Sequence, residues 1–206
     1  MTLTSAVATA RTGARVARVA RFAVLLWVVF GVQPAFAHGF AGSGWLHPIT
    51  GIDHMLAMLA VGAWSAQLGR RAIVTVPVAF VCAMAAGSLA AIWNIAFAAT
   101  EAMIALSVLA LGVAIALDRR PALPIAALAT ALFGLAHGWA HGSEIPQTAD
   151  TSAYVVGFLV TTAGLHVAGA VGGLLLLERR HGRRWLRAAG IATAIAGVGL
   201  LGVQLG

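Results

Sequence analysis

The sequence predicts an all-α polytopic membrane protein, a bundle of about six transmembrane helices that follows a cleavable N-terminal signal peptide. Of its 206 residues, 61% are hydrophobic and only 9% are charged, whereas a soluble domain carries roughly a quarter charged residues. Apolar runs of about twenty residues, the length that spans a bilayer, recur along the chain. Lipid is therefore the expected solvent of this protein.

Residues 1–37 have the pattern of a secretory signal peptide. Four arginines between positions 11 and 21 precede an apolar stretch at 22–32, and an Ala-Phe-Ala segment that ends at residue 37 supplies a cleavage pattern. An uncleaved first helix is the alternative interpretation. Cleavage after this segment leaves one mature domain, residues 38–206, which begins at His38. Its free amine and imidazole together are able to chelate a metal, although a terminal histidine is more often without such a role.

Six apolar runs divide the mature part into candidate spans. They cover residues 49–68, 72–93, 98–117, 122–141, 152–177 and 186–205. The arginines of this part follow the first, third and fifth spans: Arg70, Arg71, Arg119, Arg120, Arg179, Arg180, Arg183, Arg184 and Arg187. Basic loops of membrane proteins stay in the cytoplasm, so we expect both mature termini in the periplasm of a bacterial inner-membrane protein. Arginines in short clusters between apolar runs set topology, and we expect no nucleic-acid partner.

Most of the other ionisable residues gather in the outer half of the predicted spans, and only Asp118, Glu178 and His181 belong to the inner face. Those of the outer half are His47, Asp53, His54, Glu101, His137, His141 and Glu144, with His166 near the middle of the fifth span. A charged group at the centre of a bilayer costs about 3 kcal/mol on insertion scales, so ionisable residues there are candidates for function. One buried histidine is more often a packing residue. A group of this size on several helices is typical of a site.

The spacing of these residues favours metal binding. His137 and His141 are four residues apart and Glu144 is three further on, so a continuous helix presents all three on one face. Asp53 is suited to bind metal itself or to accept the ring N–H of His54. Imidazole and carboxylate groups without thiolates favour Ni²⁺, Co²⁺ or Zn²⁺ over Cu(I).

The sulfur side chains add little to this site. Met58 lies four residues after His54. Its thioether is a possible copper ligand, so copper stays an alternative substrate, although a methionine at this spacing is more often part of the core. Cys82 is the single cysteine, so the chain has no disulfide framework. Because it lies inside an apolar run, we expect it to pack in the core.

Three segments resemble the motifs of the HupE/UreJ family. They run from His47 to Met58, from Phe133 to Glu144 and from Thr162 to His166, and the likeness extends over nearly all of the mature chain. The resemblance implies a permease for nickel, in some members cobalt, that supplies hydrogenase or urease maturation. It carries over as metal-path residues His47, Asp53, His54, His137, His141 and Glu144. One departure is Gly134, near which the family motif often has a further histidine.

The chemistry and the resemblance together predict a secondary transporter rather than an enzyme. The resemblance implies that its substrate is nickel, with cobalt second, and no tightly bound cofactor is expected. We expect the protein to lie in the lipid bilayer. Whether it forms a homo-oligomer stays open. The chain has no phosphate-binding loop with a lysine, so it does not hydrolyse ATP itself. Histidine must be neutral to bind metal, so uptake is expected to fall below about pH 6.

Two other functions stay open at this point. Histidines on facing helices are also able to hold haem or a metal pair, as in an integral-membrane metalloenzyme or a b-type cytochrome. A metal-binding assembly factor or sensor would bind the ion without carrying it across the membrane. The lack of a separate soluble substrate domain argues against the enzyme.

Overall fold

The computed structural model describes residues 44–97 and 99–205. These residues belong to one compact unit. The predicted signal peptide and His38 lie outside the described residues.

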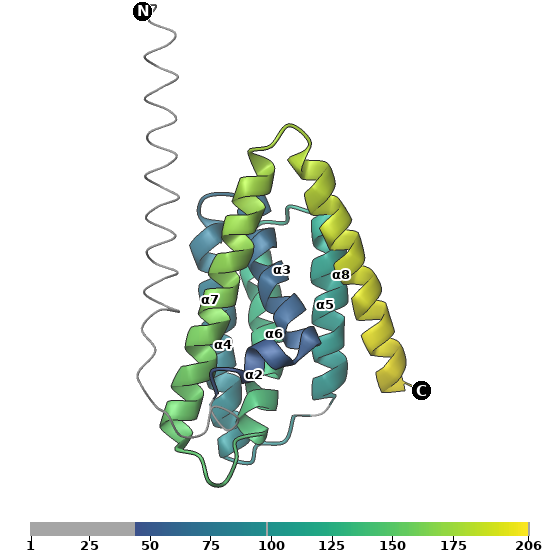
Figure 1. The fold of residues 1–206 in the computed structure, drawn as a ribbon. Coiled ribbons are helices and arrows are strands. Elements are labelled where there is room, and N and C mark those ends of the chain that lie inside the picture. Colours follow the sequence, from purple (N-terminus) through teal and green to yellow (C-terminus); the bar gives the residue numbers. More distant parts are fainter. Residues whose placement is uncertain (1–43, 98, 206) are drawn as a thin grey trace, which may run out of the picture. The chain divides into compact units, whose positions relative to one another are not determined.

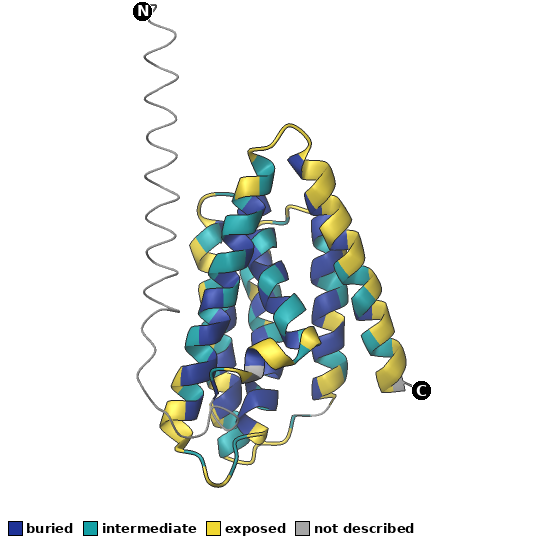
Figure 2. Ribbon diagram, in the orientation of Figure 1, coloured by how far each residue is buried: buried dark blue, intermediate teal, exposed yellow. Residues whose placement is uncertain are grey.

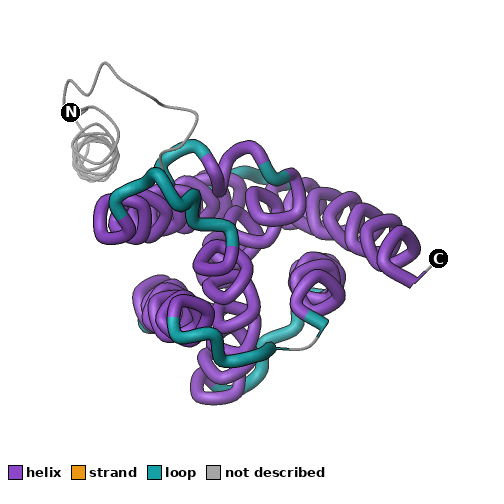
Figure 3. The backbone as a smooth tube through the Cα atoms, turned by 90° about the horizontal axis from the view of Figure 1, so that it is seen from below, coloured by secondary structure: helices purple, strands orange, loops and turns teal. Residues whose placement is uncertain are grey.

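The described chain consists of helices and their connections, and this part contains no strand (Figures 1 and 3). The helices are α2 (His47–Thr50), α3 (Ile52–Leu68), α4 (Ala72–Ile92), α5 (Thr100–Ala116), α6 (Leu123–Ser143), α7 (Thr151–Leu177) and α8 (Gly182–Leu205). The all-α prediction is confirmed for these residues.

Four of the helices, α4, α6, α7 and α8, are long and apolar enough to cross a bilayer. Helices α3 and α5 have 17 residues each and are shorter than the other four. At a rise of about 1.5 Å per residue, 17 residues extend over roughly 26 Å, slightly less than the hydrocarbon core of a typical bilayer. Four spans are therefore supported by length and composition, and the count of six stays a prediction.

The first predicted span, residues 49–68, is two helices rather than one. Gly51 has an extended backbone (φ −81°, ψ 113°) and separates α2 from α3. Its carbonyl accepts the first hydrogen bond of α3, from the Met55 N–H at 2.9 Å. Pro48 stands in the first turn of α2, a position that does not need an N–H donor. The break places Asp53 and His54 in the first turn of α3.

Two predicted helix ends differ from the structure. Helix α8 begins at Gly182, four residues before the predicted start at 186, so Arg183 and Arg184 lie in its first turn and not in a loop. Apolar patterning marks where lipid begins, whereas a helix is able to extend beyond it into water. Helix α6 continues to Ser143 and therefore contains both His137 and His141, with Glu144 as its C-terminal cap residue.

Glycines bring three pairs of helices into close contact: α4 with α6, α3 with α7, and α5 with α8. A side chain at any of these glycines would collide with backbone of the partner helix. The contacts are Gly134 with Phe80, Gly138 with Met84, Gly62 with His166, Gly169 with Leu59 and Gly112 with Ala194. Small residues have this role in membrane helix packing because they let backbones approach. Helix α3 also packs against α4, α5, α6 and α8, so its side chains lie among the other helices.

Many residues on the outward face of these helices are exposed (Figure 2), and large apolar residues are among them. Exposed examples include Val74, Val78, Ile125, Leu128, Leu132, Ile191 and Ile195. So many exposed large apolar residues are unfavourable in water, and a surrounding bilayer accounts for them. Cys82 also lies exposed on α4, so the prediction that it packs in the core is wrong. A small apolar thiol is compatible with a lipid-facing position.

The arginine-bearing connections lie together at one end of the bundle, the upper end in Figure 1. The Trp64 indole N–H, near the end of α3, donates to the Arg119 carbonyl at 3.0 Å. Arg183 at the start of α8 forms an ion pair with Asp118 at 2.9 Å. We call the connections α3–α4, α5–α6 and α7–α8 the arginine end. The connections α4–α5 and α6–α7 lie at the opposite end, as the alternation of charge predicts.

Candidate metal-binding site

His54 is oriented by the aspartate that precedes it. The Asp53 Oδ1 atom lies 3.0 Å from His54 Nδ1 and also accepts the His54 backbone N–H at 2.8 Å. An ionised carboxylate only accepts hydrogen bonds, so Nδ1 carries the proton and Nε2 has the lone pair. The His54 side chain is largely buried, with 9% of its surface exposed. A carboxylate in this position fixes the tautomer of a metal-binding histidine and raises its basicity.

Two histidines of α6 meet His54 inside the bundle. His137 and His141 are four residues apart on one face, and both are fully buried. The ring centroid of His54 lies 5.0 Å from that of His137 and 4.6 Å from that of His141, with the rings edge to face. We call these three residues the histidine cluster. The cluster lies in the half of the bundle opposite the arginine end.

The ring orientation of His137 also follows from a local hydrogen bond. Its Nδ1 lies 2.9 Å from the carbonyl oxygen of Phe133, one turn earlier in α6. A carbonyl only accepts, so Nδ1 carries the proton here as well. The His137 Nε2 atom is buried and has no hydrogen-bond partner among the described residues. A buried lone pair of this kind is costly, and a bound cation would satisfy it.

Aromatic rings connect the cluster to a deeper histidine. The Phe80 ring of α4 lies 5.2 Å from the His137 ring and 5.0 Å from the His166 ring of α7. Phe158 of α7 stacks on His141 at 4.9 Å. His166 is buried, and within the described part of the chain neither of its ring nitrogens has a hydrogen-bond partner. Eight residues of helix, about 12 Å, separate Phe158 from His166 along α7.

The imidazoles pack as rings and do not form a closed coordination shell. Across residues 44–97 and 99–205, no group of three His, Cys, Asp or Glu side chains is arranged to hold a metal ion. Edge-to-face packing aims ring carbons, as well as nitrogens, at neighbouring rings. Side-chain rotation is therefore needed before the cluster coordinates an ion.

Two further predicted site residues, Glu144 and Glu101, are exposed and do not join this cluster. Glu144 is exposed after the last turn of α6, and Glu101 is exposed in the first turn of α5. Met58 is buried and accepts a hydrogen bond from Thr162 Oγ1 at 3.3 Å, in agreement with a core position. His47 begins α2, but its side chain, like the whole of His38, lies outside the described part of the chain.

Sequence reasoning missed the aromatic residues around the cluster. Phe80 carries no signal, because it lies inside a uniformly apolar run. Helix α7 does carry one: Tyr154, Phe158, Thr162 and His166 repeat every four residues and all are buried. A face that combines polar and aromatic side chains at this period, in an otherwise aliphatic helix, is the pattern that would have found Phe158.

The helices and the buried imidazoles define a helical membrane protein with a candidate site for a transition-metal ion. Residues 6–200 match the family described as HupE / UreJ protein. The chain is similar to Protein HupE of Rhizobium leguminosarum bv. viciae, at 41% identity over 175 residues, which cover 82% of this chain and 91% of that protein. This chain therefore belongs to the HupE/UreJ family. The comparison with solved structures found no match.

Proposed function

We propose that this protein is a permease that carries nickel, with cobalt as the second choice, from the periplasm to the cytoplasm. The proposed use of the metal is the maturation of a hydrogenase or urease. The arginine end then faces the cytoplasm of a bacterial inner membrane, and both mature termini are periplasmic. The observation that carries the proposal is the meeting of His54 with His137 and His141, in the half of the bundle away from the arginines.

The described residues suggest an order of events along the path. Glu144 and Asp150 are exposed at the end opposite the arginines, where carboxylates attract cations. The histidine cluster comes next and replaces part of the water shell of the ion. Phe80 separates the cluster from His166, which takes the ion deeper. Imidazole suits both nickel and cobalt. The preference for nickel over cobalt rests on membership of the HupE/UreJ family.

The open arrangement of the cluster agrees with transport better than with storage. Conduction requires sites that bind firmly enough for entry and weakly enough for release. Imidazoles that must rotate before they coordinate bind less tightly than a closed shell does. The membrane potential supplies about 2.3 kcal/mol per charge per 100 mV, hence about 4.6 kcal/mol for a divalent cation that moves inward uncoupled.

The geometry disfavours haem between these histidines. A bis-histidine haem needs the porphyrin plane between its two imidazole rings. Ring centroids 4.6 and 5.0 Å apart leave no room for that plane between His54 and either partner. A measurement of metal flux distinguishes a permease from an assembly factor, since an assembly factor binds metal without moving it across the membrane.

Uptake of labelled nickel and cobalt in cells without other importers tests this function. His54→Ala and His137→Ala should reduce uptake to background at matched amounts of protein in the membrane. Leu128→Ala is the control, because this side chain lies on the exposed face of the helix that carries His137. Undiminished uptake in both histidine variants would refute the assignment of the site.

A further inference from the structure

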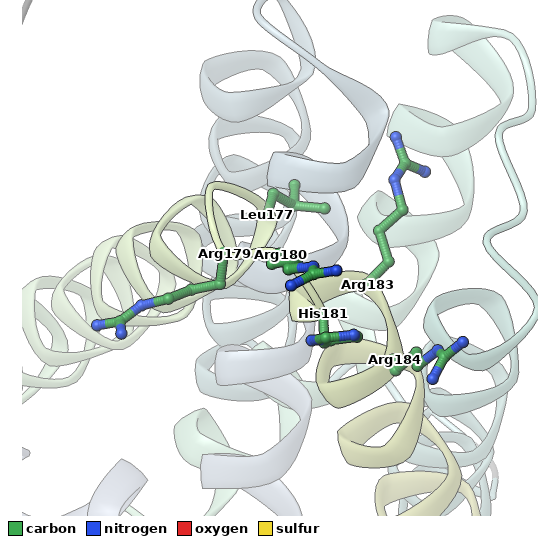
Figure 4. A pocket seen from close by; sticks show the side chains of 6 residues that line it. All are labelled: Leu177, Arg179, Arg180, His181, Arg183 and Arg184. Carbon is green, nitrogen blue, oxygen red and sulfur yellow. The ribbon is translucent and has the colours of Figure 1, made fainter.

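The turn between α7 and α8 forms a basic pocket on the surface of the arginine end. The pocket has a volume of about 400 Å³ and is lined by Leu177, Arg179, Arg180, His181, Arg183 and Arg184 (Figure 4). It lies in the half of the bundle away from the histidine cluster, and the proposed transport does not use it.

Most of the charge at this turn is uncompensated. Arg183 pairs with Asp118 at 2.9 Å, and Arg187 donates to the Ala116 carbonyl at 2.8 Å. Arg179, Arg180 and Arg184 are exposed and form no ion pair within residues 44–97 and 99–205, although Glu178 is a neighbour in sequence. Guanidinium groups bind phosphate oxygens through paired N–H donors. The pocket is therefore suited to a phosphate group.

The surface that continues from the pocket along α8 is apolar. Trp185 follows directly after Arg184 and is 67% exposed, and Ile191, Ile195 and Val198 are exposed further along the helix. Helix α8 is also the least buried of the four apolar helices. Tryptophan is enriched at the level of lipid headgroups. A ligand with a phosphate and hydrocarbon chains matches both parts of this surface.

The orientation of the protein in the membrane does not by itself require the basic pocket at the α7–α8 turn. The positive-inside rule needs basic residues near the ends of spans, and Arg70 and Arg71 after α3 meet that need. It does not need a pocket of this size, edged by three guanidinium groups that form no ion pair in the described part of the chain. Basic pockets beside membrane helices at the cytoplasmic side are typical of sites for anionic lipid headgroups.

We propose that the α7–α8 turn binds the phosphate of an anionic phospholipid, whose acyl chains lie along the outward face of α8. Free inorganic phosphate shares the recognised group but lacks the chains. The preference for lipid comes from Leu177 in the pocket and from the apolar face beyond Trp185. This proposal does not depend on which ion the protein transports.

The test measures lipid binding to the purified full-length protein in detergent. Native mass spectrometry should detect phosphatidylglycerol retained by the wild type, with at least fivefold less retained by R180Q/R184Q. The matched control is R70Q/R71Q, which removes the same charge from another exposed connection and should retain lipid as the wild type does. Equal retention by R180Q/R184Q and the control would overturn the proposal, because lipid binding would then depend no more on the arginines of the α7–α8 turn than on those after α3.

Thermal stability separates the two sources of phosphate. Phosphatidylglycerol added in mixed detergent micelles should raise the melting temperature of the wild type, whereas phosphatidylcholine in the same micelles or inorganic phosphate should not. A rise of equal size with inorganic phosphate would overturn the assignment to lipid. If the double variant does not fold, the single variant R184Q, at an exposed position, replaces it and should show a smaller rise in melting temperature with phosphatidylglycerol than the wild type.

Discussion

The histidine cluster and the α7–α8 turn both carry ionisable groups, but the cluster buries them whereas the turn exposes them. His54, His137 and His141 are buried, and each ring packs against another ring or an aromatic side chain. The arginines at positions 179, 180 and 184 are exposed and reach outward. Buried imidazole is tolerated because it is neutral without its proton, whereas guanidinium stays charged and must remain near water or phosphate. The chemistry of the side chain thus decides which ionisable groups are buried in the bundle and which stay at its surface.

The largest expected effect comes from the packing that supports the cluster. Gly138 lies between the two α6 histidines in sequence and packs closely against α4, where a methyl group on it would collide with the Met84 carbonyl. Gly138→Ala should therefore abolish the folded protein in the membrane. Gly172→Ala is the control, since a side chain at that position meets no atom within 4 Å. Size-exclusion chromatography of both solubilised variants measures this, and equal monodisperse amounts would contradict the tight contact of α4 with α6.

The second effect separates the cluster from the deeper histidine. His137→Ala should abolish both nickel binding and nickel flux, because it removes a ring of the cluster. His166→Ala should retain binding but lose flux, since His166 lies beyond Phe80. Calorimetric binding to purified protein and uptake by cells provide the two readouts. Loss of binding in both variants, with both correctly folded, would mean that the four histidines form one site.

A smaller effect is expected from the carboxylate behind His54. Loss of a group that orients a metal-binding histidine typically costs 10- to 100-fold in affinity, so Asp53→Ala should reduce apparent nickel affinity by about tenfold or more. Asp53→Asn should lose less, because its side-chain oxygen still accepts the His54 ring N–H. The concentration of nickel at half-maximal uptake measures this. Equal losses in the two variants would show that the charge of Asp53, and not its hydrogen bond, is what matters.

The smallest effect belongs to the arginine end. Arg120 pairs with Asp118 at 3.1 Å, and both side chains are partly exposed. Ion pairs of this kind contribute about 0.2–1 kcal/mol, so Arg120→Gln should change the melting temperature little and leave uptake unchanged. A loss of uptake comparable with that of His137→Ala would show that the two ends are coupled.

The sequence predicted the features that depend on period and composition. The arginine-bearing connections do share one end, and His137 and His141 do share one face of α6. These features follow from the spacing of residues near each other in the chain or from charge. Both can be read from the sequence without knowing which helices are neighbours.

The remaining features depend on which helices are neighbours. Nothing in the sequence places Phe80 of α4 between His137 and His166, because an apolar run has no marked face. For the same reason Cys82, predicted for the core, is exposed on that helix. Gly134 packs against the Phe80 carbonyl, so the absence of a histidine there leaves room for the contact between α4 and α6.

Nickel flux into liposomes that contain only the purified protein tests the central claim most directly. With a negative potential inside, vesicles with the wild type should accumulate nickel well above protein-free vesicles. Vesicles with His137→Ala at the same protein density should match the protein-free level. Flux in His137→Ala vesicles equal to that of the wild type, or wild-type flux no greater than that of protein-free vesicles, would contradict a metal path through the histidine cluster.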